Sequence, residues 1–338
     1  MGMSVWHRRL QVKRTPALAL CLLSLALLPS AALAHGRLSA TAGRVEYLHL
    51  AEEGMRQRSS WGSGGWYCEY LHCTGAYPLL TIWGEVRMFE AANAAELASP
   101  SSVRRALVDR FARASESYWN PHLNGYAPYP NDKYRGAEAW FDDNGWLGVA
   151  FTEAYRATRE SRYLHDARRA LTFVAGQGWD AAGGGGMWWN TTHPYHSGEA
   201  LAADALLATL LYGLDHERSQ LATARKLIAW ADAHDTGYQG LYLSGGSHST
   251  VIDYIEGPLI YAQYLLCGAS GQSGYCEHAA EQAHTMTQIY GVQYNFAPLY
   301  DSIFLQWMMA YGKAVGDGHW LALARANAVQ ASQHAANG

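Results

Sequence analysis

Residues 140–146 read Trp-Phe-Asp-Asp-Asn-Gly-Trp, and an apolar run that reaches Ala157 follows them directly. This pattern predicts a helix whose first turn carries two adjacent carboxylates and an amide between aromatic rings. Such side chains cap helix N-termini, because they accept hydrogen bonds from the free backbone N–H groups there. Two carboxylates in different surroundings can also divide into an acid and a base or nucleophile. At the level of the residues both interpretations stay open.

Helical patterns of two kinds alternate along the chain. One kind is apolar nearly all round, as in residues 201–214, and helices of this kind are buried on every side. The other kind is amphipathic, as in residues 163–175, and covers one side of a core. Inner, apolar helices are expected at 78–93, 143–158, 198–214, 254–268 and 301–315, and outer helices at 40–58, 102–117, 163–175, 218–233, 276–290 and 319–335.

The inner helices recur every ~45–65 residues, which is typical of a repeated helix hairpin in a helical array. Long connections precede the inner helices and favour a closed (α/α) barrel over an open superhelix. The expected fold is therefore all-α, with inner helices surrounded by outer ones. No linker rich in Pro, Ser or charge divides residues 35–338, so we expect a single domain there.

The N-terminal segment has the pattern of a secretory signal peptide. Basic residues at 8–14 precede an apolar run at 17–28 that is too short to span a bilayer, and Ala32-Leu33-Ala34 offers a small-residue cleavage site. An uncleaved membrane anchor is the alternative. We expect residues 1–34 to be removed and the mature protein to be secreted or periplasmic, without an integral membrane span.

The chain has 25 Lys and Arg against 29 Asp and Glu, and four of the basic residues lie in the expected signal peptide. The acidic balance argues against nucleic acid or an anionic membrane as the main partner.

Four cysteines follow the signal peptide, and an even count in an oxidising compartment suggests disulfides. The cysteines form two pairs that are close in sequence, so we expect the bridges Cys68–Cys73 and Cys267–Cys276. Their spacing does not resemble a structural zinc site, and no metal or other cofactor is expected.

The segments that precede the inner helices are rich in Trp, Tyr, Asn, His and Asp. If the inner helices run parallel, these segments lie together at one end of the barrel. Aromatic platforms beside hydrogen-bonding groups suit a sugar, whose ring has apolar faces and hydroxyl edges. The candidate substrate-binding residues are Trp66, Asn144, Trp188, Trp189, Asn190, Tyr195, His196, Asp253, Tyr254, Glu256, Tyr300 and Asp301.

Structural roles compete with binding for several of these residues. Asp253, Glu256 and Asp301 open inner helices, so capping is the alternative for them. Core packing is the alternative for Trp188 and Trp189, although two consecutive Trp side chains on a Gly-rich loop cannot easily both point inward. The histidines lack the spacing of a metal site such as H-E-x-x-H, and no Gly-x-Ser-x-Gly motif indicates a serine nucleophile.

Residues 140–144, at the start of an expected inner helix, resemble the Asp-Asp motif of glycoside hydrolase family 76, the α-1,6-mannanases. Residues 178–190, with their Gly run and Trp-Trp-Asn, resemble the Gly-Gly-x-Trp-Trp-x loop of that family. The segments 254–262 and 300–307 resemble its later inner helices. Phe141 departs from the family, which often has Tyr there, and the loops at 193–196 and 244–250 have no clear match.

The resemblance implies an (α/α)6 barrel, one inner helix more than the five expected above. It also implies a retaining, endo-α-1,6-mannanase-like glycoside hydrolase, with Asp142 as nucleophile and Asp143 as general acid/base. Retaining enzymes hold such carboxylates about 5–5.5 Å apart. The expected partner is an α-linked mannan or a related polysaccharide. The alternatives are a transglycosylase that uses the same two aspartates, a non-catalytic glycan-binding protein and a helical scaffold without glycan affinity.

Overall fold

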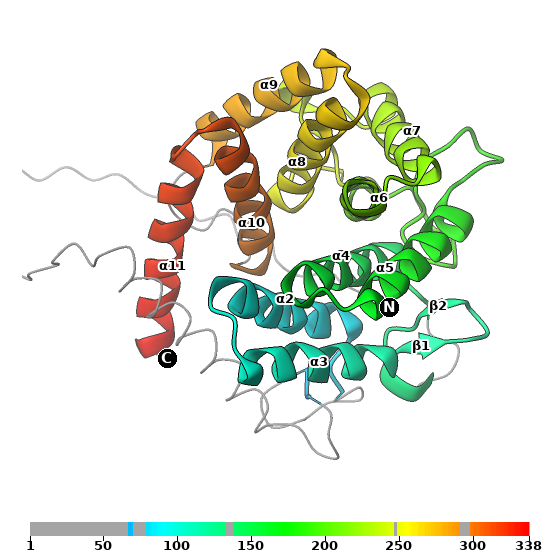
Figure 1. Ribbon diagram of the computed structural model, residues 1–338. Helices are drawn as coiled ribbons and strands as arrows, with labels where there is room; N and C mark the ends of the chain where they lie inside the picture. The colour runs from blue at the N-terminus through cyan, green and yellow to red at the C-terminus, as the bar shows by residue number, and fades with distance from the viewer. Residues whose placement is uncertain (1–66, 70–78, 133–137, 247–248, 291–297, 338) are drawn as a thin grey trace, which may run out of the picture. The chain divides into compact units, whose positions relative to one another are not determined.

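Ten α-helices run through the part of the chain that the computed structural model describes, which is residues 67–69, 79–132, 138–246, 249–290 and 298–337. All of these residues belong to the unit formed by residues 44–338. Helices that follow one another along the chain alternate between an inner and an outer position (Figure 1). The inner helices are α2 (Ile82–Ala98), α4 (Phe141–Thr158), α6 (Gly198–Asp215), α8 (Asp253–Ser270) and α10 (Pro298–Val315).

Each inner helix is followed by an outer helix that packs against it, and consecutive inner helices pack against each other. The outer helices are α3 (Ser102–Glu116), α5 (Ser161–Phe173), α7 (Arg218–His234), α9 (Ser273–Ile289) and α11 (His319–Asn337). The expected all-α barrel of alternating helices is therefore confirmed. The outer helix expected at 40–58 and the signal peptide expected at 1–34 lie outside the described residues, and the single domain at 35–338 stays a prediction.

The remaining elements are short. The strands β1 (Trp119–Asn120) and β2 (Gly125–Tyr126) form an antiparallel pair between α3 and α4, with Trp119 opposite Tyr126. Three further helical turns are η1 (Pro130–Asp132), η2 (Val174–Gly178) and η3 (Tyr238–Gly240), of which η2 is a π-helix. Among the described residues, no helix is both long enough and apolar enough to cross a membrane.

The inner helices are buried on nearly all sides, as their apolar sequences predict. In α6 thirteen residues are buried, and they include every position from Ala200 to Leu211. One core cluster extends from α2 to α8 and includes two residues of α10, and a second joins α8 to α11. Burial of these side chains is the main force that holds the helices together.

One of the two expected disulfides lies entirely within the described residues. Cys267 and Cys276 form a disulfide that joins the last turns of α8 to the first turn of α9, which confirms the expected bridge. Cys68 is also disulfide-bonded. Its expected partner Cys73 lies outside the described residues.

Small residues let α4 and α6 approach closely. A Cβ atom on Gly145 would lie 2.3 Å from Asp204 Oδ1 and 2.9 Å from Ala203 Cβ. Gly148, one turn further along α4, is close to Leu207 in the same way. Asp204 is completely buried, and burial raises the pKa of its carboxyl well above the usual value, which favours its uncharged form. This contact fixes the first turn of α4 against α6.

The N-terminus of α4 is also held by its neighbours in the loops. The Phe141 N–H donates to the Trp189 carbonyl at 3.0 Å. Asn144 is completely buried, and its Oδ1 accepts the Tyr126 N–H at 2.7 Å. Its Nδ2 donates to the carbonyls of Tyr126 and Trp140 at 3.0 and 2.8 Å. Asn144 thus joins β2 to α4, and it is not among the residues that line the cavity described below.

Replacement of Gly145 tests the close contact between α4 and α6. Gly145→Ala forces a methyl group against Asp204 and Ala203, and we expect it to lower the free energy of unfolding by about 1–3 kcal/mol. Gly213→Ala is the matched control on α6, because no atom lies within 4 Å of a Cβ there. That variant should gain up to about 1 kcal/mol from helix propensity. Urea unfolding measures both values, and equal stability of the two variants would contradict the packing argument.

Candidate active site

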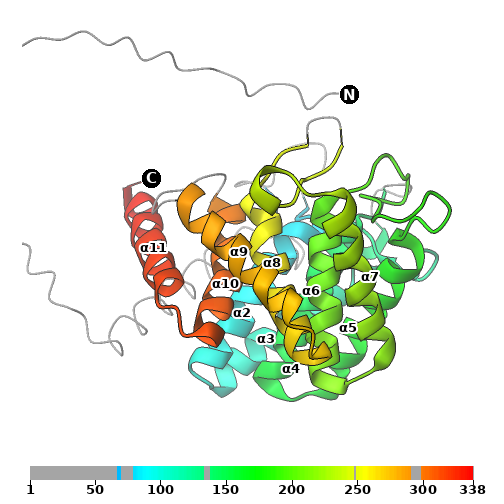
Figure 2. The same ribbon diagram turned by 90° about the horizontal axis from the view of Figure 1, so that it is seen from above.

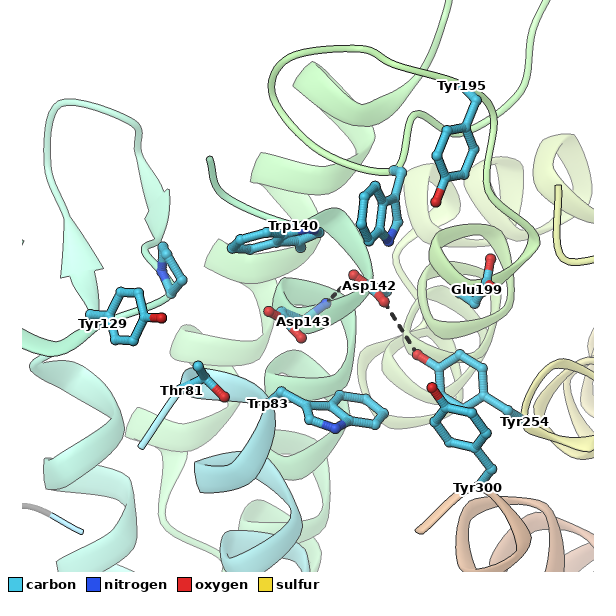
Figure 3. A pocket seen from close by; sticks show the side chains of 12 residues that line it. Thr81, Trp83, Tyr129, Trp140, Asp142, Asp143, Tyr195, Glu199, Tyr254 and Tyr300 are labelled. Atoms are coloured by element: carbon cyan, nitrogen blue, oxygen red, sulfur yellow. Dashed lines mark hydrogen bonds between the residues drawn. The ribbon is translucent and has the colours of Figure 1, made fainter. Parts of the chain in front are cut away.

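A cavity of about 320 Å³ opens at one end of the barrel, where the N-termini of the five inner helices meet. In Figure 2 the connections that lead into α6 and α8, coloured green and yellow, lie together at this end of the helices. The sequence predicts this gathering if the inner helices run parallel, and they do. The cavity is lined by Thr81, Trp83, Pro128, Tyr129, Trp140, Asp142, Asp143, Trp189, Tyr195, Glu199, Tyr254 and Tyr300 (Figure 3).

Asp142 lies in the first turn of α4 and is half-buried. Its Oδ1 accepts the Asp143 N–H at 2.9 Å, and its Oδ2 accepts the Tyr254 hydroxyl at 3.4 Å. Burial raises the pKa of Asp142 to about 6, against the lowering effect of these two hydrogen bonds. The carboxyl group is therefore mostly ionised at neutral pH, and both hydrogen bonds favour the anion.

Tyr254 owes its orientation to a second hydrogen bond. The indole N–H of the buried Trp146 donates to the Tyr254 hydroxyl oxygen at 2.6 Å, so the hydroxyl proton is left for Asp142. Burial first, and then the charge of Asp142, raise the pKa of Tyr254 well above its usual value. The hydroxyl therefore keeps its proton and remains a hydrogen-bond donor at and around neutral pH.

Asp143 lies beside Asp142 on the same turn but in different surroundings. Its side chain is only 8% exposed. Burial raises its pKa well above the usual value, and the negative charge of Asp142 raises it further. Two neighbouring acids of this kind lose their protons one after the other, and the one with better hydrogen bonds ionises first. Asp142 thus ionises first, and Asp143 keeps its proton to higher pH than Asp142.

A buried arginine lies near the two acids. The guanidinium group of Arg87 on α2 lies over Trp83 at 5.0 Å and over Trp146 at 4.9 Å from the ring centroids. It is paired with Glu90 at 2.7 Å. The charge of Arg87 lowers the pKa of both Asp142 and Asp143, but by less than burial raises them.

Aromatic rings form two walls of the cavity (Figure 3). On one side the Trp189 ring stacks on Tyr195 at 5.3 Å and meets Trp140 edge-on at 6.1 Å. On the other side the rings of Trp83 and Tyr300 meet edge-on, with their centroids 6.5 Å apart. Both rings also pack against Tyr254. These rings supply flat apolar surfaces beside the carboxyl groups, as a sugar ring requires.

The glycine run at 183–186 shapes the loop that carries Trp189. Gly185 and Gly186 have φ angles of 108° and 102°, which only glycine adopts readily. A Cβ atom on Gly185 would lie 2.5 Å from Trp230, and one on Gly186 would lie 2.7 Å from His196. The loop can therefore fold tightly against α7 on its way to the cavity.

Three predicted residues of this loop are not among those that line the cavity. Trp188 stacks on His193 and packs against His196, with ring centroids 5.1 and 4.5 Å away. The His196 Nε2 is 3.0 Å from Asp180 Oδ2. Asn190 Oδ1 accepts the N–H and the hydroxyl of Thr192 at 2.9 and 2.7 Å. These contacts hold the loop together, and only Trp189 of the Trp-Trp pair lines the cavity. Trp66 lies outside the described residues.

Three predicted acids near the N-termini of α8 and α10 are buried and do not belong to the cavity lining either. Asp253 and Glu256 are completely buried, and Asp301 is 2% exposed. Asp253 Oδ1 accepts the Tyr254 N–H at 2.7 Å, and Glu256 Oε1 accepts the Tyr242 N–H at 2.8 Å. Burial and the neighbouring carboxyl group of Asp301 raise the pKa of Asp253 to about 8. Asp253 thus accepts an N–H in the first turn of α8, and Glu256 joins α8 to the connection that precedes it.

Several lining residues are not singled out by the sequence patterns. Trp83 and Glu199 lie inside the first turns of α2 and α6, where only the rotation of each helix decides which side chain faces the cavity. Trp140 lies two residues before Asp142, so the sequence does signal it through its nearness to the two carboxylates. Thr81, Pro128 and Tyr129 lie in connections without a motif. Among the described residues, no group of three or more His, Cys, Asp or Glu could hold a metal ion.

An unequal pair of acids between aromatic walls, at the mouth of a helical barrel, is the arrangement of a glycoside hydrolase. Residues 63–290 match the family model of glycosyl hydrolase family 76. The chain belongs to this family. A search among curated proteins finds no match.

Solved structures support the fold. The family 76 α-mannanase of Bacteroides thetaiotaomicron is 18% identical, with a TM-score of 0.75 over 84% of this chain and 82% of that one. The α-1,6-mannanase of Salegentibacter sp. is also 18% identical, with a TM-score of 0.65 over 79% and 80% of the two chains. An inactive variant of the latter, with two consecutive aspartates replaced by asparagine, is known in complex with α-1,6-mannotriose. It matches with 18% identity and a TM-score of 0.63, over 79% of this chain and 80% of its own.

The raised pKa of Asp253 makes stability depend on pH. The folded protein holds this proton up to about pH 8, whereas an unfolded chain releases it near pH 4. The folded state binds more protons between these values, so we expect stability to fall as the pH rises from 4 to 8. Asp253→Asn should flatten this slope and raise stability at pH 8, as measured by urea unfolding at several pH values.

Asp180→Asn is the control for that measurement. A hydrogen bond from the Gly183 N–H lowers the pKa of Asp180, so it does not titrate in this window. A slope that is unchanged in Asp253→Asn, or flattened equally by both variants, would show that the Asp253 proton is not its source.

Proposed function

We propose that the protein is a retaining, endo-acting hydrolase of α-1,6-linked mannose chains, with Asp142 as nucleophile and Asp143 as general acid/base. Its family membership and the mannanase activity named for its structural neighbours support the substrate class. The inactive neighbour that lacks two consecutive aspartates supports a role for such a pair. We further propose that the protein acts after export, as a secreted or periplasmic enzyme.

The observation that carries this proposal is the difference between two adjacent carboxyl groups. Asp142 accepts two hydrogen bonds that stabilise its anion, and its pKa is raised only to about 6. Asp143 is held in its acid form by burial and by the charge of Asp142. One group can attack as an anion while the other can give a proton, which is the division of labour that glycoside cleavage requires.

In the first step the Asp142 carboxylate attacks the anomeric carbon while Asp143 gives its proton to the glycosidic oxygen. The bond between these two sugar atoms breaks, and a glycosyl ester forms on Asp142. The ester has no charge. The negative charge of Asp142, which is the second cause after burial of the raised pKa of Asp143, is therefore removed. Asp143 can then accept a proton from water, which attacks the anomeric carbon and releases Asp142 as a carboxylate.

The same intermediate allows transglycosylation as the second candidate. A sugar hydroxyl that stacks on the aromatic walls can replace water in the second step, with the same proton transfer to Asp143. The products distinguish the two reactions, because hydrolysis shortens every chain whereas transfer also creates longer ones.

Asp142→Asn and Asp143→Asn test the roles of the two acids. Each should reduce the release of oligosaccharides from linear α-1,6-mannan by at least about 10³-fold, because a nucleophile or a proton donor is lost. Binding of α-1,6-mannotriose, measured by calorimetry, should persist in both. Turnover within tenfold of the parent in either variant would refute the assignment.

Alanine variants, tested with azide and an activated dinitrophenyl α-mannoside, assign the roles individually. Azide should give a β-mannosyl azide with Asp142→Ala and an α-mannosyl azide with Asp143→Ala. Anomeric NMR of the unmodified enzyme should show the α-anomer first, and a β-anomer as first product would exclude retention.

Tyr254→Phe tests the hydrogen bond to Asp142. Activity of the parent should rise as the pH rises through about 6, where Asp142 ionises, and fall at higher pH as Asp143 loses its proton. Without the Tyr254 hydroxyl the anion loses a donor, so we expect the acidic limb to move to higher pH and kcat to fall about tenfold. The measurement is a profile of kcat/KM against pH for each protein, because kcat/KM reports the pKa values of the free enzyme, together with kcat at the optimum pH.

Tyr300→Phe is the comparison for this variant. Its hydroxyl lies in the same cavity, but the described hydrogen bonds of Asp142 come from Tyr254 and Asp143. The acidic limb of this variant should stay in place. An equal displacement of the acidic limb in both variants would mean that the Tyr254 hydroxyl does not specifically stabilise the Asp142 anion.

A further inference from the structure

Glu199 is an acid of the cavity that the two-step mechanism does not use. It lies in the first turn of α6 and is half-buried. In Figure 3 it stands on the α6 side of the cavity, away from the turn of α4 that carries Asp142 and Asp143. Neither wall of aromatic rings explains why a carboxyl group is needed at this place.

Hydrogen bonds fix the Glu199 carboxyl group. The Ser197 hydroxyl donates to Glu199 Oε2 at 2.8 Å, while the same Ser197 oxygen accepts the Ala200 N–H at 3.2 Å. Ser197 is completely buried and is the N-cap of α6. One carboxyl oxygen of Glu199 is thus occupied by the protein, and the residue lines the cavity with the rest of its side chain.

The backbone around Glu199 cannot withdraw from the cavity. Gly198 lies against the chain at 243–244: its N–H donates to the Ser244 carbonyl at 3.0 Å. A Cβ atom on Gly198 would lie 2.1 Å from the Leu243 carbonyl oxygen. The first turn of α6 is therefore held from behind.

The surroundings of Glu199 favour its uncharged form. Burial first, and then the charges of Asp142 on α4 and Asp235 after α7, raise the pKa of Glu199 to about 7, against the lowering effect of hydrogen bonds from its own backbone N–H and from Ser197. Tyr195, Tyr254 and Tyr300 face it from the preceding loop, α8 and α10, since its charge contributes to raising the pKa of each. The residues that line the cavity include no Lys or Arg.

We propose that Glu199 is a specificity-determining residue that donates a hydrogen bond from its protonated carboxyl group to an oxygen of the bound sugar. The inference rests on the proposed function, because the sugar is taken to be a mannose unit of the α-1,6-linked chain. Since Oε2 accepts the Ser197 hydroxyl, the proton lies on Oε1. Loss of this proton removes the donor and adds a second negative charge beside Asp142, so substrate binding weakens as Glu199 ionises.

The pH dependence of KM separates this role from a structural one. In the parent enzyme KM for α-1,6-mannan should rise as the pH rises through about 7, where Glu199 ionises. Glu199→Gln keeps an acceptor for Ser197 and a donor for the sugar at every pH, so its KM should stay low and flat. Glu199→Ala should have a KM about tenfold higher at pH 6, with kcat within about threefold of the parent.

Glu217→Gln removes the same charge from an exposed position and should leave KM and its pH dependence unchanged. The proposal is overturned if Glu199→Ala keeps the KM of the parent, or if Glu199→Gln keeps the pH dependence. It is also overturned if either variant loses more than about 10²-fold in kcat at unchanged KM, because Glu199 would then act in the chemical step.

Calorimetry with α-1,6-mannotriose separates this inference from the proposed function. Asp143→Asn is the background, because it stops turnover and leaves the described contacts of Glu199 in place. The inference is supported if adding Glu199→Ala to Asp143→Asn lowers the affinity for α-1,6-mannotriose about tenfold. Equal binding by the single and double variants overturns the inference alone. No binding by Asp143→Asn overturns the proposed substrate and the inference with it.

Discussion

Two adjacent carboxyl groups buried on one turn of helix cannot both be ionised at low cost, and the site depends on this constraint. Burial raises the pKa of Asp142 and Asp143 alike, and the first charge that forms raises the pKa of the remaining acid. The surrounding residues decide which acid ionises first. The Trp146 indole and the Tyr254 hydroxyl form a short chain of donors that ends on Asp142, and the Arg87 charge limits the cost for both acids. The asymmetry of the pair therefore comes from residues on α4 and α8, whereas Arg87 on α2 acts on both acids.

The barrel brings helix capping and the proposed catalysis to the same residues. Parallel inner helices bring five N-termini, with their free N–H groups and positive dipole ends, to one cavity. Asp142 accepts a backbone N–H of its own first turn, as a capping residue does, and still presents its other oxygen to Tyr254. The two interpretations of the Asp-Asp pair are thus compatible. The close contact of Gly145 with Asp204 matters to both, because it holds the turn that carries the acids.

Much of the fold and part of the site can be predicted from the sequence. The remainder cannot, for a physical reason. Inner and outer helices are encoded by local periodicity, so their order and approximate ends could be predicted. The direction of a side chain at a helix N-terminus changes by ~100° per residue and depends on how the helix is rotated in the barrel. Tyr254 therefore lines the cavity while its neighbour Asp253 is buried behind it. The same uncertainty applies to Glu199, which faces the cavity from an otherwise apolar helix. It also applies to Asn144, which is completely buried although Asp142 and Asp143 beside it line the cavity.

Formation of the glycosyl ester on Asp142 would reach beyond the reacting atoms. The charge of Asp142 contributes to the raised pKa of both Asp143 and Glu199, and the ester removes that charge. Both acids then release their protons more easily in the intermediate than in the free enzyme. For Asp143 this favours its change from acid to base in the second step. For Glu199 it lowers the pH at which the hydrogen bond proposed to hold the sugar is lost. In the proposed mechanism, the covalent step would thus couple sugar binding to the chemistry, through the electrostatics of one buried charge.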